Sequence, residues 1–391
     1  MPYFILCKIF FLNKVHKVHM SDDNLTKKHR KKKLRLKKNL YGNVKSKIDT
    51  GLSREGDSRR VAAPHRDTFA KKTVVKNVPK MSNLKDLISL GRRIKMGERF
   101  TKINNEALSK CYIHIIDLDE LIGLKSLKST IFDQVIYFLQ DLNKIARREF
   151  LHTCLTGSSG VGKTEVAKIL SRLYASLGTI ENPTYKFKIA HREDLVASYL
   201  GQTATKTLDI LNSCLGGVLF IDEVYALGSG VEGKDSFSKE AVDTLCGFLS
   251  ENAGKFVCII AGYEKDVKRC FFNLNQGLES RFPWVHKLED YSPKELAQIF
   301  KKQVIQIKWA LKTDDEEKIL HLVEENADLF KKGQGRAVQN FLVKCKIQHS
   351  RRNLWDPDGK SGHISYQDVA DTIASFKSTK EESDSFQSMY S

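Results

Sequence analysis

The stretch of residues 151–170 constrains the fold of this chain more than any other part of the sequence. It reads LHTCLTGSSGVGKTEVAKIL, which is an apolar run, a glycine-rich loop and the start of an amphipathic helix. The loop GSSGVGKT, residues 157–164, has the spacing G-x-x-x-x-G-K-[ST] that is typical of a phosphate-binding loop. Because this loop requires a buried strand before it and a helix after it, the stretch predicts the first unit of a parallel α/β sheet.

The residue types in this loop suit the binding of a polyphosphate. Glycine leaves no Cβ where the backbone wraps closely around phosphate oxygens, and successive N–H groups at the start of a helix attract the anion. Lys163 can reach the β- and γ-phosphates of ATP, and the Thr164 hydroxyl can ligate Mg²⁺. The predicted nucleotide-binding residues of the loop are Gly157, Ser158, Ser159, Gly160, Val161, Gly162, Lys163 and Thr164.

A second element of the phosphate site follows in GVLFIDE, residues 217–223. Its apolar part predicts a buried strand whose end presents two carboxylates. Asp222 can hold Mg²⁺, usually through water, and Glu223 can polarise the water that attacks the γ-phosphate. The alternative is a strand that merely ends in a solvated acidic pair, and the phosphate-binding loop upstream makes it the weaker interpretation.

Apolar segments separated by helical stretches predict a parallel sheet that helices cover on both faces. The predicted strands are 151–156, 185–190, 217–221, 255–261 and 284–288. From Ser292 onward, capping signals and helical periodicity predict an all-helical subdomain. The expected organisation is a basic extension without fixed structure (1–80), a segment with helical stretches (81–112), a nucleotide-binding α/β subdomain (113–291), the helical subdomain (292–376) and a polar, disordered tail (377–391).

The positive charge of the chain is concentrated near its N-terminus. Residues 1–100 hold 27 Lys and Arg against 8 Asp and Glu, whereas the whole chain has a net charge of +18, so the remainder is nearly neutral. The densest run is KKHRKKKLRLKK, residues 27–38. Residues 21–80 are read as a solvated tail, with a nuclear-targeting signal or a nucleic-acid-binding arm as the alternatives.

The cysteines and the apolar segments indicate where in the cell the protein is located. None of the eight cysteines forms C-x-x-C or a zinc-type cluster, and no apolar run has the length of a membrane span. The apolar residues 1–12 lack the basic start and the cleavage site of a signal peptide, and Met20 is the expected translation start. We therefore expect an intracellular protein, cytoplasmic or nuclear, that is not secreted and has no membrane partner.

Several motifs occur in a particular order: GSSGVGKT, REDLVASYLGQTATKT, GVLFIDEVYAL, SKEAVDTL, VCIIAGYEKDV and GLESRF. Together they resemble the AAA+ ATPases of the CbbX/CfxQ type, which include stage V sporulation protein K as a relative. The resemblance covers about residues 110–375. It implies a five-stranded sheet of order 5-1-4-3-2, a C-terminal helical lid, and a homo-oligomeric, hexameric ring with ATP and Mg²⁺ bound between subunits.

The resemblance assigns roles to further residues. Arg281 matches an arginine finger that reaches the γ-phosphate of a neighbouring subunit, and a surface ion pair is the alternative. Arg336 matches the lid residue called sensor 2, which contacts the γ-phosphate of its own subunit. Ile122 and Gly123 match the segment whose backbone touches adenine, with core packing as the alternative. Glu223, Arg281 and Lys163 form the expected catalytic set.

The resemblance assigns two further sites, the pore loop and sensor 1. Tyr199, Leu200 and Gly201 match the pore loop, in which an aromatic residue projects into the channel of the ring and grips a polypeptide. AAA+ proteins generally have a polar residue, called sensor 1, after the fourth strand. Here that strand ends in Ala261-Gly262-Tyr263, as in the CbbX-type group, which leaves Tyr263 as the candidate.

These expectations combine into a single function. We expect an ATP-hydrolysing AAA+ ring motor that remodels a protein partner. The alternative is a nucleic-acid loader or translocase that uses residues 21–80 as a basic arm, although no DNA-binding module is recognisable in the neutral part of the chain. A non-catalytic ATP-dependent scaffold is the third interpretation, and the complete set of Lys163, Asp222, Glu223 and Arg281 argues against it.

Overall fold

The structure is a computed structural model that describes residues 75–142, 151–180, 186–199, 201–228, 236–355 and 362–389. Side chains are described up to residue 378 within the last of these ranges. The expectations for residues 1–74 of the basic extension and for Leu200 fall outside the described residues. The described chain forms one unit that begins after the N-terminal segment 1–70.

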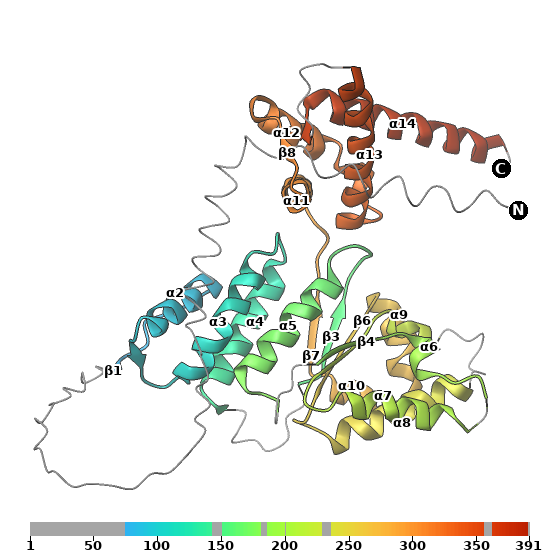
Figure 1. The fold of residues 1–391 in the computed structure, drawn as a ribbon. Coiled ribbons are helices and arrows are strands. Elements are labelled where there is room, and N and C mark those ends of the chain that lie inside the picture. Colours follow the sequence, from blue (N-terminus) through green and yellow to red (C-terminus); the bar gives the residue numbers. More distant parts are fainter. Residues whose placement is uncertain are drawn as a thin grey trace, which may run out of the picture. The chain divides into compact units, whose positions relative to one another are not determined.

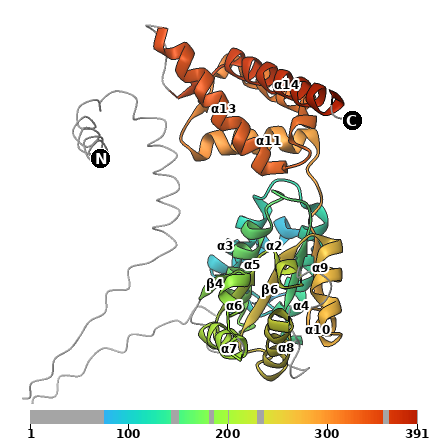
Figure 2. The ribbon, with the colours of Figure 1, turned by 90° about the vertical axis from the view of Figure 1, so that its right-hand side faces the viewer.

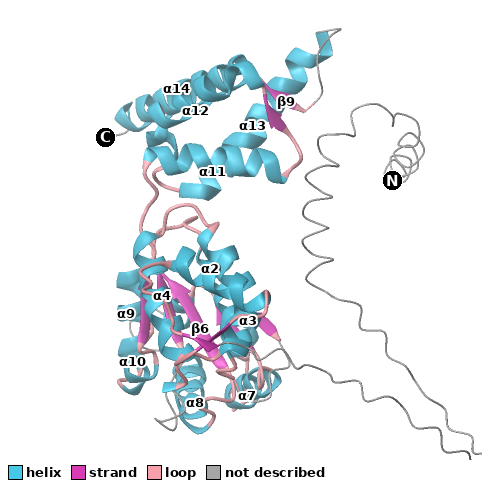
Figure 3. Ribbon diagram, turned by 90° about the vertical axis from the view of Figure 1, so that its left-hand side faces the viewer, coloured by secondary structure: helices cyan, strands magenta, loops and turns pink. Residues whose placement is uncertain are grey.

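A five-stranded parallel sheet organises the first part of the described chain (Figures 1 and 3). Its strands are β3 (Thr153–Thr156), β4 (Phe187–Ala190), β5 (Val218–Ile221), β6 (Val257–Gly262) and β7 (Trp284–Lys287). They lie in the order β4-β5-β6-β3-β7, and every neighbouring pair is parallel. Numbered along the sheet-forming segments, this order is 5-1-4-3-2, so the predicted topology is confirmed.

Burial explains why these short segments form strands. All residues of the inner strands β3, β5 and β6 are buried, because helices cover both faces of a parallel sheet. Cys154 of β3 and Cys258 of β6 are both fully buried, which confirms that they act as small apolar core residues. The outer strands β4 and β7 are partly exposed, as the edges of a sheet are.

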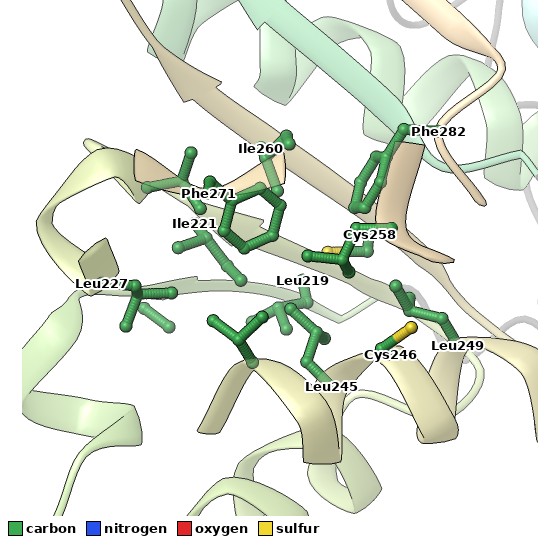
Figure 4. Packing of buried hydrophobic residues seen from close by; sticks show 14 of the residues in the cluster. Leu219, Ile221, Leu227, Leu245, Cys246, Leu249, Cys258, Ile260, Phe271 and Phe282 are labelled. Carbon is green, nitrogen blue, oxygen red and sulfur yellow. The ribbon is translucent and has the colours of Figure 1, made fainter. Parts of the chain in front are cut away.

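Two groups of helices cover the sheet. On one face, α7 (Thr203–Ser213) and α8 (Ser236–Glu251) pack leucines such as Leu211, Leu245 and Leu249 onto strands β5 and β6 (Figure 4). On the other face, α4 (Lys125–Leu139) contacts β7, and α5 (Lys163–Leu177) contacts β3 and β6 (Figure 1). The shorter elements are α6 (Arg192–Leu195), η2 (Val224–Gly228), α9 (Glu264–Cys270), η4 (Phe272–Leu274) and α10 (Gly277–Arg281).

The segment that precedes α4 contains two helices. Helix α2 (Leu84–Lys95) is capped by Asn83, and helix α3 (Asn105–Asp119) packs against α2 and α5. Two short parallel strands, β1 (Val75–Lys76) and β2 (Arg99–Phe100), flank α2. Helix α3 continues across the boundary expected at residue 112, because its buried apolar spacing persists through Ile115 and Leu118.

The C-terminal region is helical, as expected for a lid (Figure 2). It contains α11 (Pro293–Gln306), η5 (Thr313–Asp315), α12 (Glu316–Glu325), η6 (Ala327–Phe330), α13 (Gln334–Trp355) and α14 (Tyr366–Met389). The capping box at the start of α11 is present, because the Ser292 N–H donates to Glu295 Oε2 at 2.8 Å and the Glu295 N–H donates to Ser292 Oγ at 3.4 Å.

Two features of this region differ from the expectation. Two strands of two residues each, β8 (Ala310–Leu311) and β9 (His363–Ile364, labelled in Figure 3), pair in parallel and connect loops between the helices. A strand of two residues is too short to show a periodic pattern in the sequence. Helix α14 runs to Met389, so the expectation of a disordered tail over 377–391 is wrong for its backbone up to that residue. The segment contains no Gly or Pro, and extending an existing helix is far easier than starting one.

No helix within the described ranges has the length and apolar character that a membrane span needs.

Several aromatic residues pack together within the apolar core of the lid. Phe341 on α13 is buried, and its ring centroid lies 5.7 Å from that of Phe300, 5.3 Å from that of Phe330 and 5.8 Å from that of Phe376. Because these partners come from α11, η6 and α14, one ring joins four elements. Edge-to-face and tilted contacts at such distances add to the burial of apolar area.

We expect Phe341→Ala to lower the free energy of unfolding by about 3–5 kcal/mol, because it leaves a cavity shared by these elements. Urea denaturation followed by circular dichroism measures this change. Val343→Ala is the matched control on the same helix, since Val343 is 50% exposed, and it should cost no more than about 0.5 kcal/mol. Equal losses for the two variants would contradict this account of the lid core.

Candidate functional site

The glycine loop lies where the sequence predicted it, between strand β3 and helix α5. Its three glycines have positive φ angles of 154° at Gly157, 75° at Gly160 and 94° at Gly162. Close contacts reinforce this requirement, because a Cβ at Gly157 would lie 2.7 Å from the Leu288 carbonyl oxygen, and one at Gly160 would lie 2.0 Å from that of Gly333. The sequence folds into this loop because only glycine tolerates both conditions.

Lys163 extends from the first turn of α5 back over the loop. Its Nζ donates hydrogen bonds to the carbonyl oxygens of Gly157 and Ser158, at 2.8 Å each. Burial lowers the pKa of the Lys163 ammonium, and the carboxylates of Asp222 and Glu223 oppose that shift. A partly desolvated cation is thus held above the loop, where the phosphates of a nucleotide would lie.

The two expected magnesium ligands, which follow different strands of the sheet, contact each other. The Thr164 hydroxyl on α5 donates a hydrogen bond of 3.1 Å to Oδ2 of Asp222, which follows the end of β5. A hydroxyl and a carboxylate are hard oxygen donors of the kind that Mg²⁺ takes at nucleotide sites. The residues present therefore fit the ion, and Thr164 and Asp222 would hold it beside the phosphates.

Glu223 has a strained backbone. Its φ angle is +50°, in the left-handed region that a residue other than glycine seldom adopts, and its N–H donates to Asp222 Oδ1 at 3.0 Å. The side chain is exposed, at the entrance to the phosphate site. Because the side chain is exposed and lines the cavity, a water molecule could approach its carboxylate.

A cavity of about 550 Å³ joins these residues to the segment around Ile122 and to the lid. Ile122 lines it, whereas Gly123 has a positive φ of 67° and lies against Glu295, where an added Cβ would meet Oε1 at 2.9 Å. Predicted residues that line the cavity are Ile122, Ser159, Gly160, Val161, Gly162, Lys163, Thr164, Asp222, Glu223, Tyr263 and Arg336. The volume lies in the range of pockets that bind small ligands.

The start of α13 lies directly on the glycine loop. The Gly335 N–H donates to the Gly160 carbonyl oxygen at 3.1 Å, and Arg336 follows it into the cavity. The Arg336 guanidinium contributes to lowering the pKa of Lys163, although less than burial does. The structure therefore brings the sensor 2 candidate to the phosphate site of its own subunit.

Sequence reasoning missed two residues that fix this contact. The Tyr291 hydroxyl donates to the Val161 carbonyl oxygen at 2.8 Å, and its N–H donates to Gln334 Oε1 at 3.0 Å. Gln334 is buried and has a positive φ of 46°. Its position between two glycines, in Gly333-Gln334-Gly335, is the only signal in the sequence that could have indicated an unusual backbone here.

Arg281 does not line the cavity of its own chain. It ends helix α10, where its Nε donates to Ser250 Oγ at 2.6 Å and its NH1 bonds the Gly277 carbonyl oxygen. Both of these hydrogen-bond partners are neutral groups.

The pore-loop candidates lie between α6 and α7. The Tyr199 side chain is 71% exposed, and Gly201 has a positive φ of 75°. An aromatic side chain this exposed contributes little to the core, which favours a contact with another molecule. The structure does not bring Tyr199 to the cavity, and Leu200 lies outside the described residues.

Comparisons with known proteins agree with this geometry. The family model "ATPase family associated with various cellular activities (AAA)" matches residues 153–283. The chain is 38% identical to a cfxQ-like protein, R730, of Acanthamoeba polyphaga mimivirus, over 77% of this chain and 73% of that protein. It is 32% identical to stage V sporulation protein K of Bacillus subtilis (61% and 75%) and 32% identical to the chloroplastic ribulose bisphosphate carboxylase/oxygenase activase of Cyanidioschyzon merolae (62% and 84%).

The sheet order, the glycine loop and the acidic strand end define a P-loop nucleotide-binding protein. Within that class, the chain belongs to the AAA+ ATPases of the CbbX/CfxQ type, and it is an ATP-hydrolysing enzyme.

We expect Lys163→Ala to weaken ATP binding by at least about 10-fold, because the variant lacks the cation that faces the phosphates. Titration with a fluorescent ATP analogue measures the dissociation constant. Lys168→Ala is the matched control, since Lys168 lies on the same helix, outside the cavity, in an ion pair with Glu165. Unchanged binding by Lys163→Ala, or equal losses for both variants, would contradict the assignment.

Proposed function

We propose that this ATPase works as a homo-oligomeric, hexameric ring with each active site shared between two subunits, and that it remodels a protein partner. The position of Arg281 carries the proposal. It matches the arginine finger of the family, and it lies outside the cavity that holds Lys163 and Glu223 of the same chain. A site with an exposed base on one subunit would therefore be completed by the next.

Each residue then has a distinct task in hydrolysis. Lys163 and the loop N–H groups bind the phosphates, and Thr164 and Asp222 would hold Mg²⁺, which would supply positive charge beside the phosphates. Glu223 accepts a proton from the water that attacks in line with the γ-phosphate. Arg281 of the neighbouring subunit stabilises the charge of the transition state.

The lid would respond to the state of the nucleotide. Its contact with the glycine loop passes through Gly335 and Tyr291, next to the position of Arg336. Loss of the γ-phosphate removes a partner of Arg336, which would shift the balance between arrangements of the lid. The motion that we assign to the hexameric ring thus arises because Arg336 contacts the nucleotide differently before and after the γ-phosphate is lost.

A protein partner is favoured over nucleic acid. One relative is named as an activase of ribulose bisphosphate carboxylase/oxygenase, and Tyr199 offers an exposed aromatic side chain at the position of the pore loop. Residues 101–391 hold nearly equal numbers of basic and acidic residues, so no excess of positive charge outside the N-terminal segment favours a nucleic acid. We also propose an intracellular location, cytoplasmic or nuclear, which the free cysteines among the described residues support.

We expect Arg281→Ala to lower ATP turnover by about 10³-fold or more while nucleotide binding persists, because the finger acts on the transition state of a neighbouring site. Glu223→Gln should also bind ATP without turning it over. A mixture of the two variants should recover turnover, since one interface type combines an intact Glu223 with an intact Arg281. Arg269→Ala, which removes an exposed arginine paired with Asp266, is the control.

Steady-state ATPase assays of each variant and of the mixture test this complementation. A mixture as inactive as its two components would contradict the shared site, as would near-normal turnover by Arg281→Ala alone.

We expect Tyr199→Ala to lose most of the stimulation of ATPase activity by a permanently unfolded polypeptide. Tyr199→Phe should retain the stimulation, because the aromatic ring of this side chain makes the contact with the polypeptide. The ratio of stimulated to unstimulated turnover is the measurement. Stimulation by DNA that falls steeply with salt, in place of stimulation by polypeptide, would contradict the protein-remodelling proposal and favour the basic arm 21–80.

A further inference from the structure

The arginine finger candidate is bound by polar groups of its own chain that have no task in the mechanism above. Arg281 ends helix α10, and its Nε donates a hydrogen bond of 2.6 Å to Oγ of Ser250 on helix α8. Its Nη1 donates to the carbonyl oxygen of Gly277, at the start of α10. Because the guanidinium is planar and two of its nitrogens are bound, the orientation of its plane is restricted.

The Ser250 hydroxyl is suited to accept a hydrogen bond from a cation. It donates its own proton to the Cys246 carbonyl oxygen, one turn earlier in α8, at 3.0 Å. The lone pairs of the hydroxyl oxygen therefore remain for the N–H group of the arginine. Rotation of the serine side chain about χ1 would break the bond to the carbonyl group, so the direction of the acceptor is restricted as well.

A second polar residue, Asn275, holds the helix that carries the arginine. Its Oδ1 accepts the Gly277 N–H at 2.8 Å, in the first turn of α10, and its Nδ2 donates to Oδ1 of Asp243 on α8 at 2.8 Å. The thiol of Cys246, also on α8, lies 3.6 Å from the same Oδ1. Since a helix of five residues has little stability of its own, these contacts with α8 determine where α10 lies.

Apolar packing anchors both helices beside these hydrogen bonds. Phe282, which directly follows Arg281, is buried in the same core cluster as Leu245 and Leu249 of α8 (Figure 4). The guanidinium lies against Gly277, where an added Cβ would be 2.7 Å from Nη1. The core thus fixes the backbone of Arg281, while Ser250 binds the end of its side chain.

We propose that Ser250 is the positioning residue for Arg281, and that α8 thereby presents the arginine to the neighbouring subunit. An arginine side chain has many rotamers, and only a few of them would reach a nucleotide across an interface. The bond at Nε restricts these rotamers, while Nη2 has no acceptor among the described residues and can bind a phosphate oxygen. This proposal rests on the proposed role of Arg281 as the finger of a shared site.

The test is Ser250→Ala, which removes only the hydroxyl. We expect kcat to fall by about 10-fold, the effect of losing one hydrogen bond to a charged group, while the dissociation constant for ATP changes by less than about 2-fold. Ser250→Thr, which keeps the hydroxyl, should retain most of the turnover. Thr244→Val is the matched control, because the Thr244 hydroxyl bonds the Glu240 carbonyl oxygen of the same helix in the same manner, and its kcat should be unchanged. Circular dichroism melting of each variant verifies folding.

Two further measurements distinguish positioning from a general structural effect. In an Arg281→Ala background, single-turnover hydrolysis should respond to Ser250→Ala by less than about 2-fold, because Ser250 acts through the guanidinium that the background lacks. Mixing Ser250→Ala with Glu223→Gln should raise the turnover per Ser250→Ala subunit. In such a mixture, the Glu223→Gln subunits supply a correctly held Arg281 to neighbours whose Glu223 is intact.

An unchanged or increased kcat for Ser250→Ala would overturn the inference. The same holds for a full 10-fold loss in the Arg281→Ala background, or for a mixture with no gain in turnover per Ser250→Ala subunit. Near-normal turnover by Arg281→Ala alone would instead overturn the proposed shared site, so the two failures can be told apart.

Discussion

The left-handed backbone of the glycine loop is the constraint on which the other parts of the site depend. Gly157, Gly160 and Gly162 all have positive φ angles, and carbonyl oxygens occupy the space where a Cβ would lie at the first two. Because glycine allows the backbone to turn within residues 157–162, helix α5 begins at Lys163, directly after the loop that follows strand β3. Asp222 then meets Thr164 from the neighbouring part of the sheet, which assembles the phosphate site.

The same loop connects catalysis to the lid. Val161 and Gly160 offer their carbonyl oxygens to Tyr291 and Gly335, so the face of the loop turned away from the sheet is in contact with the helical region. Hydrogen bonds between backbone groups and a tyrosine hydroxyl are directional, and they respond to small shifts of either partner. We infer that this contact allows the lid to sense whether phosphate is bound.

Much of the architecture could be predicted because it depends on local patterns. The five strands, the helix after the glycine loop and the capping box at Ser292 follow from periodicity and residue type over a few positions. The contacts of Tyr225 with Tyr263 and of Tyr291 with Val161 could not, since they depend on how segments distant in the sequence pack together. The continuation of helix α14 to Met389 was missed. A polar composition indicates that a segment is solvated, but it does not tell whether a helix that has already started extends into that segment.

If each active site is shared between two subunits, as we propose, ATP turnover depends on the assembly of the protein. ATP turnover per subunit would be measured over a dilution series while analytical ultracentrifugation reports the mass in solution with ATP present. If Arg281 completes the site of a neighbour, turnover per subunit falls together with the oligomeric fraction and vanishes in the monomer. A turnover per subunit that stays constant down to concentrations at which only monomer remains would contradict the account.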